Sequence, residues 1–293
     1  MPFFSFSIND KSILLNNFNI KPKKVYFSKN KFIWKTLNKE KNKNIYFLKK
    51  EKRKMVKCLG KNVLFCLPPS IGLGDAIEYA KAFKAIKERK ILERFGIAFT
   101  ESYSFIFRDY FNLKEIYPYI VNKEKVDEYG AFFHVTIEIK AFKNQKFLRS
   151  NIEKELKNYF NIENKTNNLF TNKANKKIKK ISIFPVSSSP IRSMPIHILK
   201  ALINYFKNSF IVEVYLDNNS EISNYLFNRI DNKNILIVDS KNSSQLINSI
   251  KKIEYGIFMD SGPLHAAKLF NKRGVLIEST VSSKILLNNY RNI

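Results

Sequence analysis

The sequence is poor in the residues that build disulfide frameworks and zinc sites. Its 293 residues include two cysteines and three histidines. Cys58 and Cys66 stand neither in a C-x-x-C pair nor beside a histidine cluster, which are the patterns that structural zinc sites and disulfide scaffolds require. We therefore expect no metal site and no disulfide, and we interpret both cysteines as ordinary thiols in a reducing compartment.

Long apolar runs are also missing. No stretch approaches the roughly 20 residues needed to span a bilayer. The first residues, MPFFSFSINDKSILL, lack the basic start, apolar stretch and small-residue cleavage site of a signal peptide. These absences predict a cytoplasmic protein.

Acidic residues are scarce relative to basic ones. The chain has 52 Lys+Arg against 25 Asp+Glu, a formal net charge of +27, and such an excess is typical of proteins with anionic partners. However, Lys, Asn, Ile and Phe are abundant along the whole chain, which indicates a general compositional bias. No nucleic-acid-binding motif accompanies the charge, so we expect no nucleic acid among the partners.

Hydrophobic residues make up 44% of the chain, and their pattern indicates four regions. Residues 1–60 are a basic N-terminal extension with one short strand candidate within 41–57. Residues 61–165 begin with a strand, a glycine-containing turn and a helix whose apolar side chains recur every three or four positions. Residues 166–180 are polar, Asn/Lys-rich and read as a linker.

Residues 181–293 alternate between strands and helices. We expect strands over residues 181–184, 210–216, 235–238, 255–259 and 274–277, with helices at 196–206, 245–252 and 263–270. Strands that alternate with helices pair in parallel. The sequence therefore predicts an α/β fold with a doubly wound sheet here, and the same general architecture in the preceding half.

The most specific motif is DSGPLH, residues 260–265, between a predicted strand and a predicted helix. Pro263 suits the first position of a helix, and Asp260, Ser261 and Gly262 can supply the cap and the turn. At the carboxyl end of parallel strands, a helix N-terminus favours a bound phosphate. The alternative is a well-capped helix without a ligand.

A second motif, Gly72-Leu73-Gly74-Asp75, follows the first strand of region 61–165. Glycines there allow a ligand or a backbone to approach closely. Asp75 fits two interpretations equally well, a helix cap and an ionised general base. The Gly-x-Gly alone is weak, because the full dinucleotide fingerprint is absent.

Two further candidates are weaker. The loop over residues 185–195 carries Ser187, Ser188 and Arg192, which together could grip a diphosphate. Glu221 follows the strand predicted at 210–216, where an acid can hold ribose hydroxyls. Taken alone, each is better explained as an ordinary polar loop.

Taken together and in this order, the motifs resemble glycosyltransferase family nine, the ADP-heptose:lipopolysaccharide heptosyltransferase family. The resemblance covers roughly residues 62–280 and depends on the segments NVLFCLPPSIGLGDAIEYAKAFKAIKER (62–89), FPVSSSPIRSMP (184–195) and DSGPLH (260–265). It implies a GT-B fold, in which two Rossmann-like domains face a cleft. Residues 61–165 would form the acceptor domain and residues 181–293 the nucleotide-sugar-binding domain.

The resemblance also implies an inverting transfer without a metal ion or cofactor. Asp75 would be the base, and Gly72 and Gly74 would lie on the acceptor side. The residues implied to bind the donor are Ser187, Ser188, Arg192, Glu221, Asp260, Ser261, Gly262, Leu264 and His265. ADP-heptose is the favoured donor, the acceptor would be a lipopolysaccharide-type or other glycan or glycolipid, and the basic surface would contact an anionic membrane peripherally.

Departures from the family pattern favour one alternative. Val186 stands where the family usually has Gly, Met194 where it has Trp, and Glu278-Ser279-Thr280 where it has Gly-Pro-Thr. The alternative function is therefore a non-catalytic protein of the same fold that binds a glycan or a nucleotide.

Overall fold

The structure is a computed structural model of the whole chain. It describes residues 25–28, 45–47, 62–68, 71–119, 121, 125, 128–129, 131–135, 140–143, 146–148, 151–162, 178–217, 219–230, 234–240, 242–287, 290 and 292–293. The predicted linker, residues 166–180, lies outside these residues apart from its last three.

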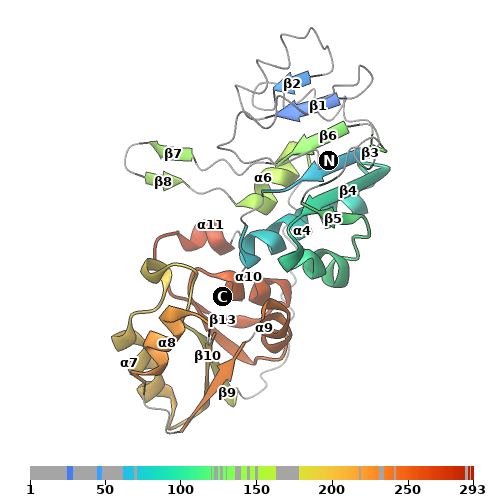
Figure 1. Cartoon of the computed structure of the whole chain (residues 1–293). Coiled ribbons are helices and arrows are strands. Elements are labelled where there is room, and N and C mark those ends of the chain that lie inside the picture. Colours follow the sequence, from blue (N-terminus) through green and yellow to red (C-terminus); the bar gives the residue numbers. More distant parts are fainter. Residues whose placement is uncertain are drawn as a thin grey trace. The chain divides into compact units, whose positions relative to one another are not determined.

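The chain forms two compact units, which are described separately (Figure 1). The first comprises Met1–Ile71, Tyr79–Ile139 and Ile152–Asn164, and the second comprises Gly72–Glu78, Lys140–Asn151 and Lys165–Ile293. Helix α4, Leu73–Glu88, is thus divided between them, and its first six residues count with the second unit.

The first unit contains a parallel sheet. Its strands lie in the order β2 (Ile45–Phe47), β1 (Val25–Ser28), β6 (Ala131–His134), β3 (Asn62–Cys66), β4 (Arg94–Phe99) and β5 (Ile116–Pro118). The strand predicted within residues 41–57 is β2, whereas β1 was not predicted. The basic extension therefore contributes two strands to this sheet.

Helices and turns connect these strands. Besides α4, the first unit contains a 3-10 turn at Glu101–Tyr103, a π-helical turn at Ile106–Tyr110 and α6, Ile152–Tyr159. The predicted apolar face of α4 is confirmed, because Tyr79, Ala80, Phe83 and Ile86 are all at most 1% exposed. The Phe83 ring packs on Phe65 of β3, with 4.8 Å between ring centroids.

The second unit has a five-stranded parallel sheet in the order β11 (Ile235–Asp239), β10 (Ile211–Leu216), β9 (Lys180–Phe184), β12 (Tyr255–Phe258) and β13 (Arg273–Leu276). Numbered along this unit, the order is 3-2-1-4-5, which is that of a doubly wound Rossmann-type sheet. This confirms the α/β fold and every strand predicted after residue 180.

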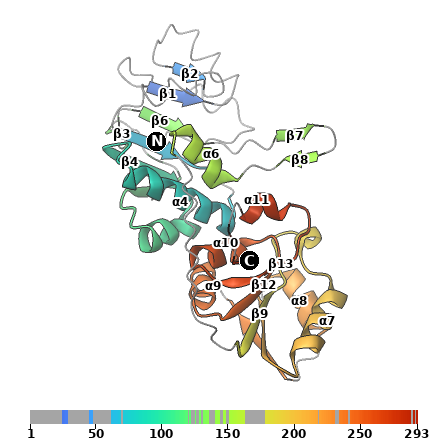
Figure 2. The ribbon, with the colours of Figure 1, turned by 180° about the vertical axis from the view of Figure 1, so that it is seen from behind.

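Helices cover both faces of this sheet (Figures 1 and 2). On one side lie α7 (Ile196–Phe206) and α8 (Glu221–Phe227), and on the other lie α9 (Ser243–Ile250) and α10 (Gly262–Leu269). The unit also contains α11 (Ser283–Leu287) and the hairpin formed by β7 (Lys140–Lys143) and β8 (Lys146–Leu148). No helix within the described residues is both long and apolar enough to cross a membrane.

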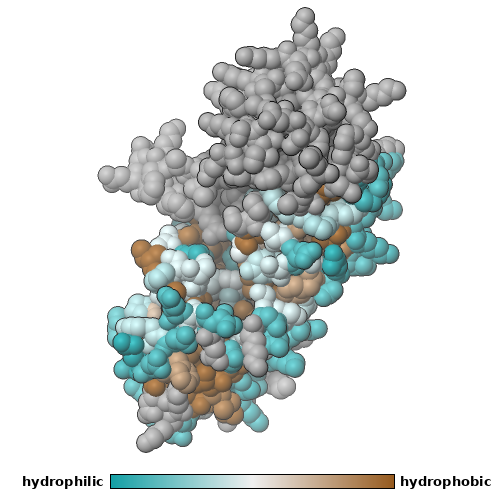
Figure 3. Space-filling model, in the orientation of Figure 1, coloured by the Kyte–Doolittle hydropathy of each residue, from teal (hydrophilic) through white to brown (hydrophobic). Residues whose placement is uncertain are grey.

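The two faces of the second sheet are packed differently. Under α7 and α8 the core is aliphatic, with Ile183 and Val214 of the sheet and Leu199 of α7 fully buried. On the opposite face, the Phe184 ring stacks between Tyr215 at 4.4 Å and Phe258 at 5.1 Å. Some apolar side chains remain at the surface of this unit (Figure 3), and Ile211 and Leu236 are each 51% exposed.

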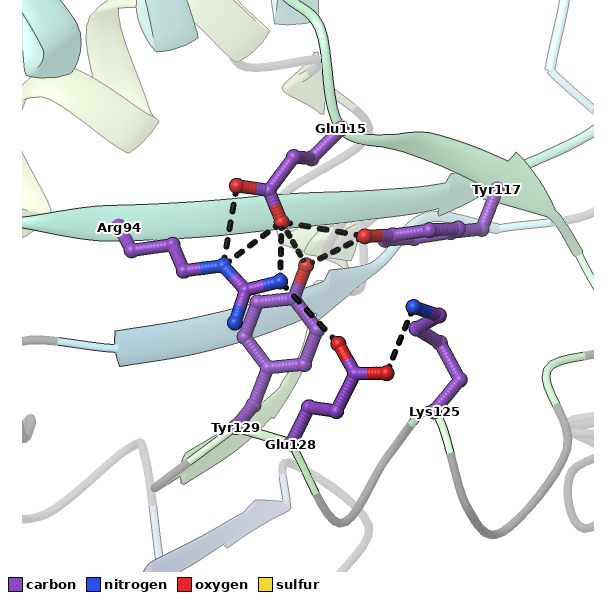
Figure 4. A network of polar contacts seen from close by, with 6 residues as sticks. All are labelled: Arg94, Glu115, Tyr117, Lys125, Glu128 and Tyr129. Atoms are coloured by element: carbon purple, nitrogen blue, oxygen red, sulfur yellow. Dashed lines mark hydrogen bonds and ion pairs between the residues drawn. The ribbon is translucent and has the colours of Figure 1, made fainter.

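A polar network joins the amino ends of strands in the first unit (Figure 4). The Glu115 carboxylate accepts hydrogen bonds from Arg94 Nε at 2.9 Å, Tyr117 Oη at 3.1 Å and Tyr129 Oη at 2.5 Å. Burial opposes ionisation of Glu115, but these donors outweigh it and hold the pKa of Glu115 below its usual value. Glu128 adds a second ion pair to Arg94 at 3.2 Å.

We expect Glu115→Gln to destabilise the first unit near neutral pH. The folded-state pKa is lowered, so this carboxylate stabilises the fold above the unfolded Glu pKa, and the contribution is lost as the pH falls through the folded value. Because the side chain is 33% exposed, solvent screening limits the loss to about 1 kcal/mol. Thermal unfolding at neutral and acidic pH should show a gap between wild type and variant that closes in acid. Glu101→Gln, at an exposed site, is the control, and an equal gap at both pH values would contradict the assignment.

Candidate functional site

Two loops of the second unit meet at the point where the strand order reverses. Strands β9 and β12 are neighbours, but the chain continues from β9 toward β10 and from β12 toward β13. In doubly wound sheets the carboxyl ends of such a strand pair form the ligand-binding crevice. The loop after β9 contains Ser187, Ser188 and Arg192, and the loop after β12 contains Asp260 and Ser261.

Hydrogen bonds join these loops and shape the first one. Ser187 Oγ donates to the Asp260 carbonyl oxygen at 3.2 Å, across 73 residues of sequence. Within the first loop, Ser193 Oγ accepts from the Ser187 amide at 3.0 Å and donates to the Ser189 carbonyl at 3.0 Å. Met194 stands where glycosyltransferase family nine, which the sequence resembles, usually has Trp. Its side chain is 2% exposed and lies in the aliphatic core. The loop is therefore anchored at both ends.

Arg192 lies between Ser188 and Asp260. Its Nη2 donates to Ser188 Oγ at 2.8 Å, and its Nη1 lies 3.7 Å from Asp260 Oδ2. The Asp260 side chain is 2% exposed, yet Oδ2 has no hydrogen-bond partner among the described residues. A buried carboxylate oxygen without a donor requires an explanation, and a ligand donor at this position would provide one.

Helix α10 begins at Gly262, two residues after Asp260. Ser261 is its N-cap residue, but the Ser261 hydroxyl donates to the Met259 carbonyl at 3.3 Å and does not cap the helix. Pro263 is the second residue of α10 (Gly262–Leu269), one position later than predicted, because the helix begins at Gly262. The positive end of the α10 dipole is thus directed at the site without a capping side chain, an arrangement that favours an anion.

The start of α4 packs against the start of α10 within the second unit. A Cβ atom added to Gly74 would lie 2.5 Å from Cδ2 of His265, and one added to Gly262 would lie 2.9 Å from Cβ of Leu73. Both glycines are therefore needed because no side chain fits between the two helix starts. Close packing between the helix starts therefore explains why residues 74 and 262 are glycines.

Asp75 has a defined place at this junction. Its Oδ2 accepts the amide hydrogen of Gly72 at 3.2 Å, the contact that the third residue of a helix makes in a capping box. The side chain is half-buried. The capping interpretation of Asp75 is thus observed, and this contact leaves its role as a base open.

Two polar residues beside His265 were not predicted from the sequence. Glu78 Oε1 lies 3.2 Å from His265 Nδ1 and accepts a hydrogen bond from Asn151 Nδ2 at 3.1 Å. Glu78 and Asn151 are 5% and 8% exposed. Glu78 does not lie on the predicted apolar face of α4 and Asn151 belongs to none of the motifs, so neither residue carried a signal in the sequence.

Glu221 lies apart from this cluster. It is the exposed first residue of α8, after the N-cap Ser220, whose Oγ accepts from the Ser223 amide at 3.4 Å. No hydrogen bond or ion pair in the described part of the chain links Glu221 to Arg192 or Asp260. Among all the residues that the structure describes, no group of three or more His, Cys, Asp or Glu side chains could hold a metal ion.

No protein-family model and no curated protein matches the sequence, but several solved structures match the fold. A family 9 glycosyl transferase from Veillonella parvula DSM 2008 has a TM-score of 0.54 and 10% identity, over 78% of this chain and 84% of its own. E. coli heptosyltransferase WaaC with ADP-2-deoxy-2-fluoro heptose has a TM-score of 0.52 and 10% identity, over 73% and 87%.

The iron-containing dodecameric glycosyltransferase TibC from enterotoxigenic E. coli H10407 is a third similar structure. Its TM-score is 0.52 at 12% identity, over 75% of this chain and 58% of its own. At such identities the similarity concerns the fold. The chain has the parallel α/β fold of GT-B glycosyltransferases, as the resemblance to family nine predicted.

We expect Gly74→Ala to destabilise the second unit and Gly72→Ala to leave it nearly unchanged. The Gly74 methyl would collide with the buried His265 ring, whereas the Gly72 methyl would meet nothing nearer than Asp75 Oδ2 at 3.9 Å. Overpacking of this kind costs about 1–3 kcal/mol. Urea unfolding of both variants measures the difference, and equal stability would contradict the tight junction between the helix starts.

Proposed function

We propose that this protein is a glycosyltransferase that uses a nucleotide-diphosphate sugar bound at the β9/β12 switch point. The observation that carries the proposal is the buried Asp260 carboxylate, which has an oxygen without a hydrogen bond, beside Arg192 and the start of α10. A sugar hydroxyl can donate to that oxygen, while the arginine and the helix dipole attract the diphosphate next to it. The fold shared with heptosyltransferases supports the same assignment and makes ADP-heptose the favoured donor.

In this proposal the loop after β9 holds the diphosphate. Arg192 and Ser188 supply the charge and the hydroxyl, and Ser187 fastens the loop through its hydrogen bond to Asp260. Backbone groups of Ser261, Gly262 and Leu264 contribute from the first turn of α10. Glu221 begins α8, which follows the carboxyl end of β10, and its proposed role is to hold a ribose hydroxyl.

Asp75 is the proposed base. It removes the proton from an acceptor hydroxyl, whose oxygen attacks the anomeric carbon while the bond from that carbon to the diphosphate oxygen breaks. A single displacement of this kind inverts the configuration. Arg192 and the N-terminus of α10 stabilise the negative charge of the leaving diphosphate, so the proposal gives a metal ion no part.

The acceptor belongs to the same proposal. A lipopolysaccharide-type glycan or another glycolipid carries both hydroxyl nucleophiles and anionic groups. The net charge of +27 favours peripheral contact with the anionic membrane that contains such a glycolipid.

We expect ADP to bind the wild type and Arg192→Ala to weaken that binding at least about 10-fold, because a charge-assisted contact to the diphosphate is lost. Isothermal calorimetry with ADP, UDP, GDP and their sugars also identifies the nucleotide. Arg273→Ala is the matched control, since Arg273 is exposed at the amino end of β13, and it should change affinity less than about 2-fold. Absence of binding by all of these nucleotides would overturn the donor site.

We expect Asp75→Asn to reduce sugar transfer by roughly 100-fold or more while ADP affinity stays within about 2-fold, because the amide cannot accept the proton. Transfer from ADP-heptose, assayed with EDTA present, measures the effect. Asp109→Asn, at an exposed site of the first unit, is the control for loss of one carboxylate. Wild-type turnover in Asp75→Asn would rule out Asp75 as the base. Nucleotide binding without transfer in the wild type would favour a non-catalytic binding protein.

A further inference from the structure

Three buried polar side chains form a row at the base of the candidate site. Asn151, Glu78 and His265 are 8%, 5% and 6% exposed, and all three belong to the second unit. Asn151 Nδ2 donates to Glu78 Oε1 at 3.1 Å and lies 3.4 Å from the Ile285 carbonyl oxygen. Oε1 of Glu78 also lies 3.2 Å from His265 Nδ1. The same carboxylate oxygen therefore accepts a hydrogen bond from Asn151 and faces the imidazole.

The two ring nitrogens of His265 have different surroundings. Nδ1 is fully enclosed and lies 3.2 Å from Glu78 Oε1, without a hydrogen bond to any described residue. The Nε2 edge of the ring borders Gly74, where an added Cβ would lie 3.0 Å from Nε2. Nε2 is thus directed toward the start of α4, the segment that carries Asp75, while Nδ1 is directed into the interior.

This asymmetry determines the tautomer of the neutral ring. A carboxylate has no proton to donate, so an ionised Glu78 at 3.2 Å stabilises the proton of a neutral imidazole electrostatically on Nδ1, the nitrogen that faces it. The group that faces one ring nitrogen thereby sets the protonation state of the other. Nε2 is then left with a lone pair.

A lone pair at Nε2 suits a particular kind of ligand group. His265 lies in the first turn of α10, and helical side chains tilt toward the N-terminus of their helix, which here follows Asp260. A lone pair repels phosphate oxygens but accepts a hydrogen bond from a hydroxyl. Arg192 would therefore bind the anionic diphosphate, and His265 would accept a hydrogen bond from a hydroxyl.

We propose that Glu78 is a positioning residue, which holds His265 as the Nδ1-protonated tautomer so that Nε2 accepts a hydrogen bond from a sugar hydroxyl at the start of α10. That the hydroxyl belongs to a sugar rests on the proposed function, whereas the tautomer of His265 does not depend on that function. Either the donor sugar or the acceptor glycan could supply this hydroxyl, and the chemistry of recognition is the same.

The tautomer is tested by NMR on the full chain labelled with ¹⁵N-histidine, at a pH where the imidazoles are neutral. The sequence has three histidines, so the His265 signals can be assigned by their loss in His265→Gln. We expect an Nδ1-protonated pattern in wild type, an Nε2-protonated pattern in Glu78→Met, and an intermediate one in Glu78→Gln, whose amide oxygen still accepts. A merely structural Glu78 would not change this signature.

Two outcomes of the spectra would overturn the positioning role. One is an Nε2-protonated His265 already in the wild type, which is decisive even if Glu78→Met fails to fold. The other is an unchanged pattern in the folded Glu78 variants. Glu88→Gln removes an exposed carboxylate from the same helix and should leave the spectrum as in wild type.

The hydroxyl contact is tested by binding of ADP and ADP-heptose. If the donor sugar supplies the hydroxyl, Glu78→Met and His265→Gln should weaken ADP-heptose binding about 3- to 10-fold, as expected for one hydrogen bond, and ADP binding less than about 2-fold. If the acceptor supplies it, both affinities stay unchanged and the KM for the acceptor rises by the same factor.

Unchanged values in both assays would overturn the contact. If the wild type binds neither nucleotide, the proposed function fails, and the contact to a sugar fails with it. The spectra still decide whether Glu78 positions His265, so the two failures are distinguishable.

Discussion

The candidate site depends on one close contact, between the first turns of α4 and α10. Gly74 and Gly262 leave no side chain between these turns, so Leu73 and the His265 ring fill the space directly. Close packing of this kind tolerates little change, because even one methylene is felt in a well-packed interior. The contact brings Asp75 and the motif 260–265 into one cluster, although they are distant in sequence. The polar chemistry at the site follows from this packing.

The polar clusters around Glu115 and Asp260 differ in how completely their carboxylate oxygens are hydrogen-bonded. Glu115 receives hydrogen bonds from an arginine and two tyrosines at the amino ends of its strands, and such a network serves the fold. Asp260 is more deeply buried, yet one of its carboxylate oxygens receives no hydrogen bond in the described part of the chain. Because unmade hydrogen bonds of buried groups are costly, the second arrangement is the one expected of the proposed donor site, where a ligand would supply the missing donor.

Much of the fold could be predicted because buried parallel strands read as short apolar runs between turns. The strands after residue 180 and the loops at 185–195 and 259–261 were found in this way. Strand β1 was not, because its few apolar residues are surrounded by lysines without a period. Glu78 and Asn151 were missed for a different reason. Their importance arises from contacts across 73 residues of sequence, and local patterns contain no information about such contacts.

The strand order also determines when the site can exist during folding. Ser187 and Asp260 are joined across 73 residues, because the first and fourth strands of the sheet are neighbours and β10 and β11 are added on the outer side of β9. Contacts of this range form late, since the intervening chain must be closed first. A chain emerging from the ribosome therefore cannot bring these two loops together until β12 is complete. A ligand that binds both loops would then stabilise only the finished sheet and favour its correct assembly.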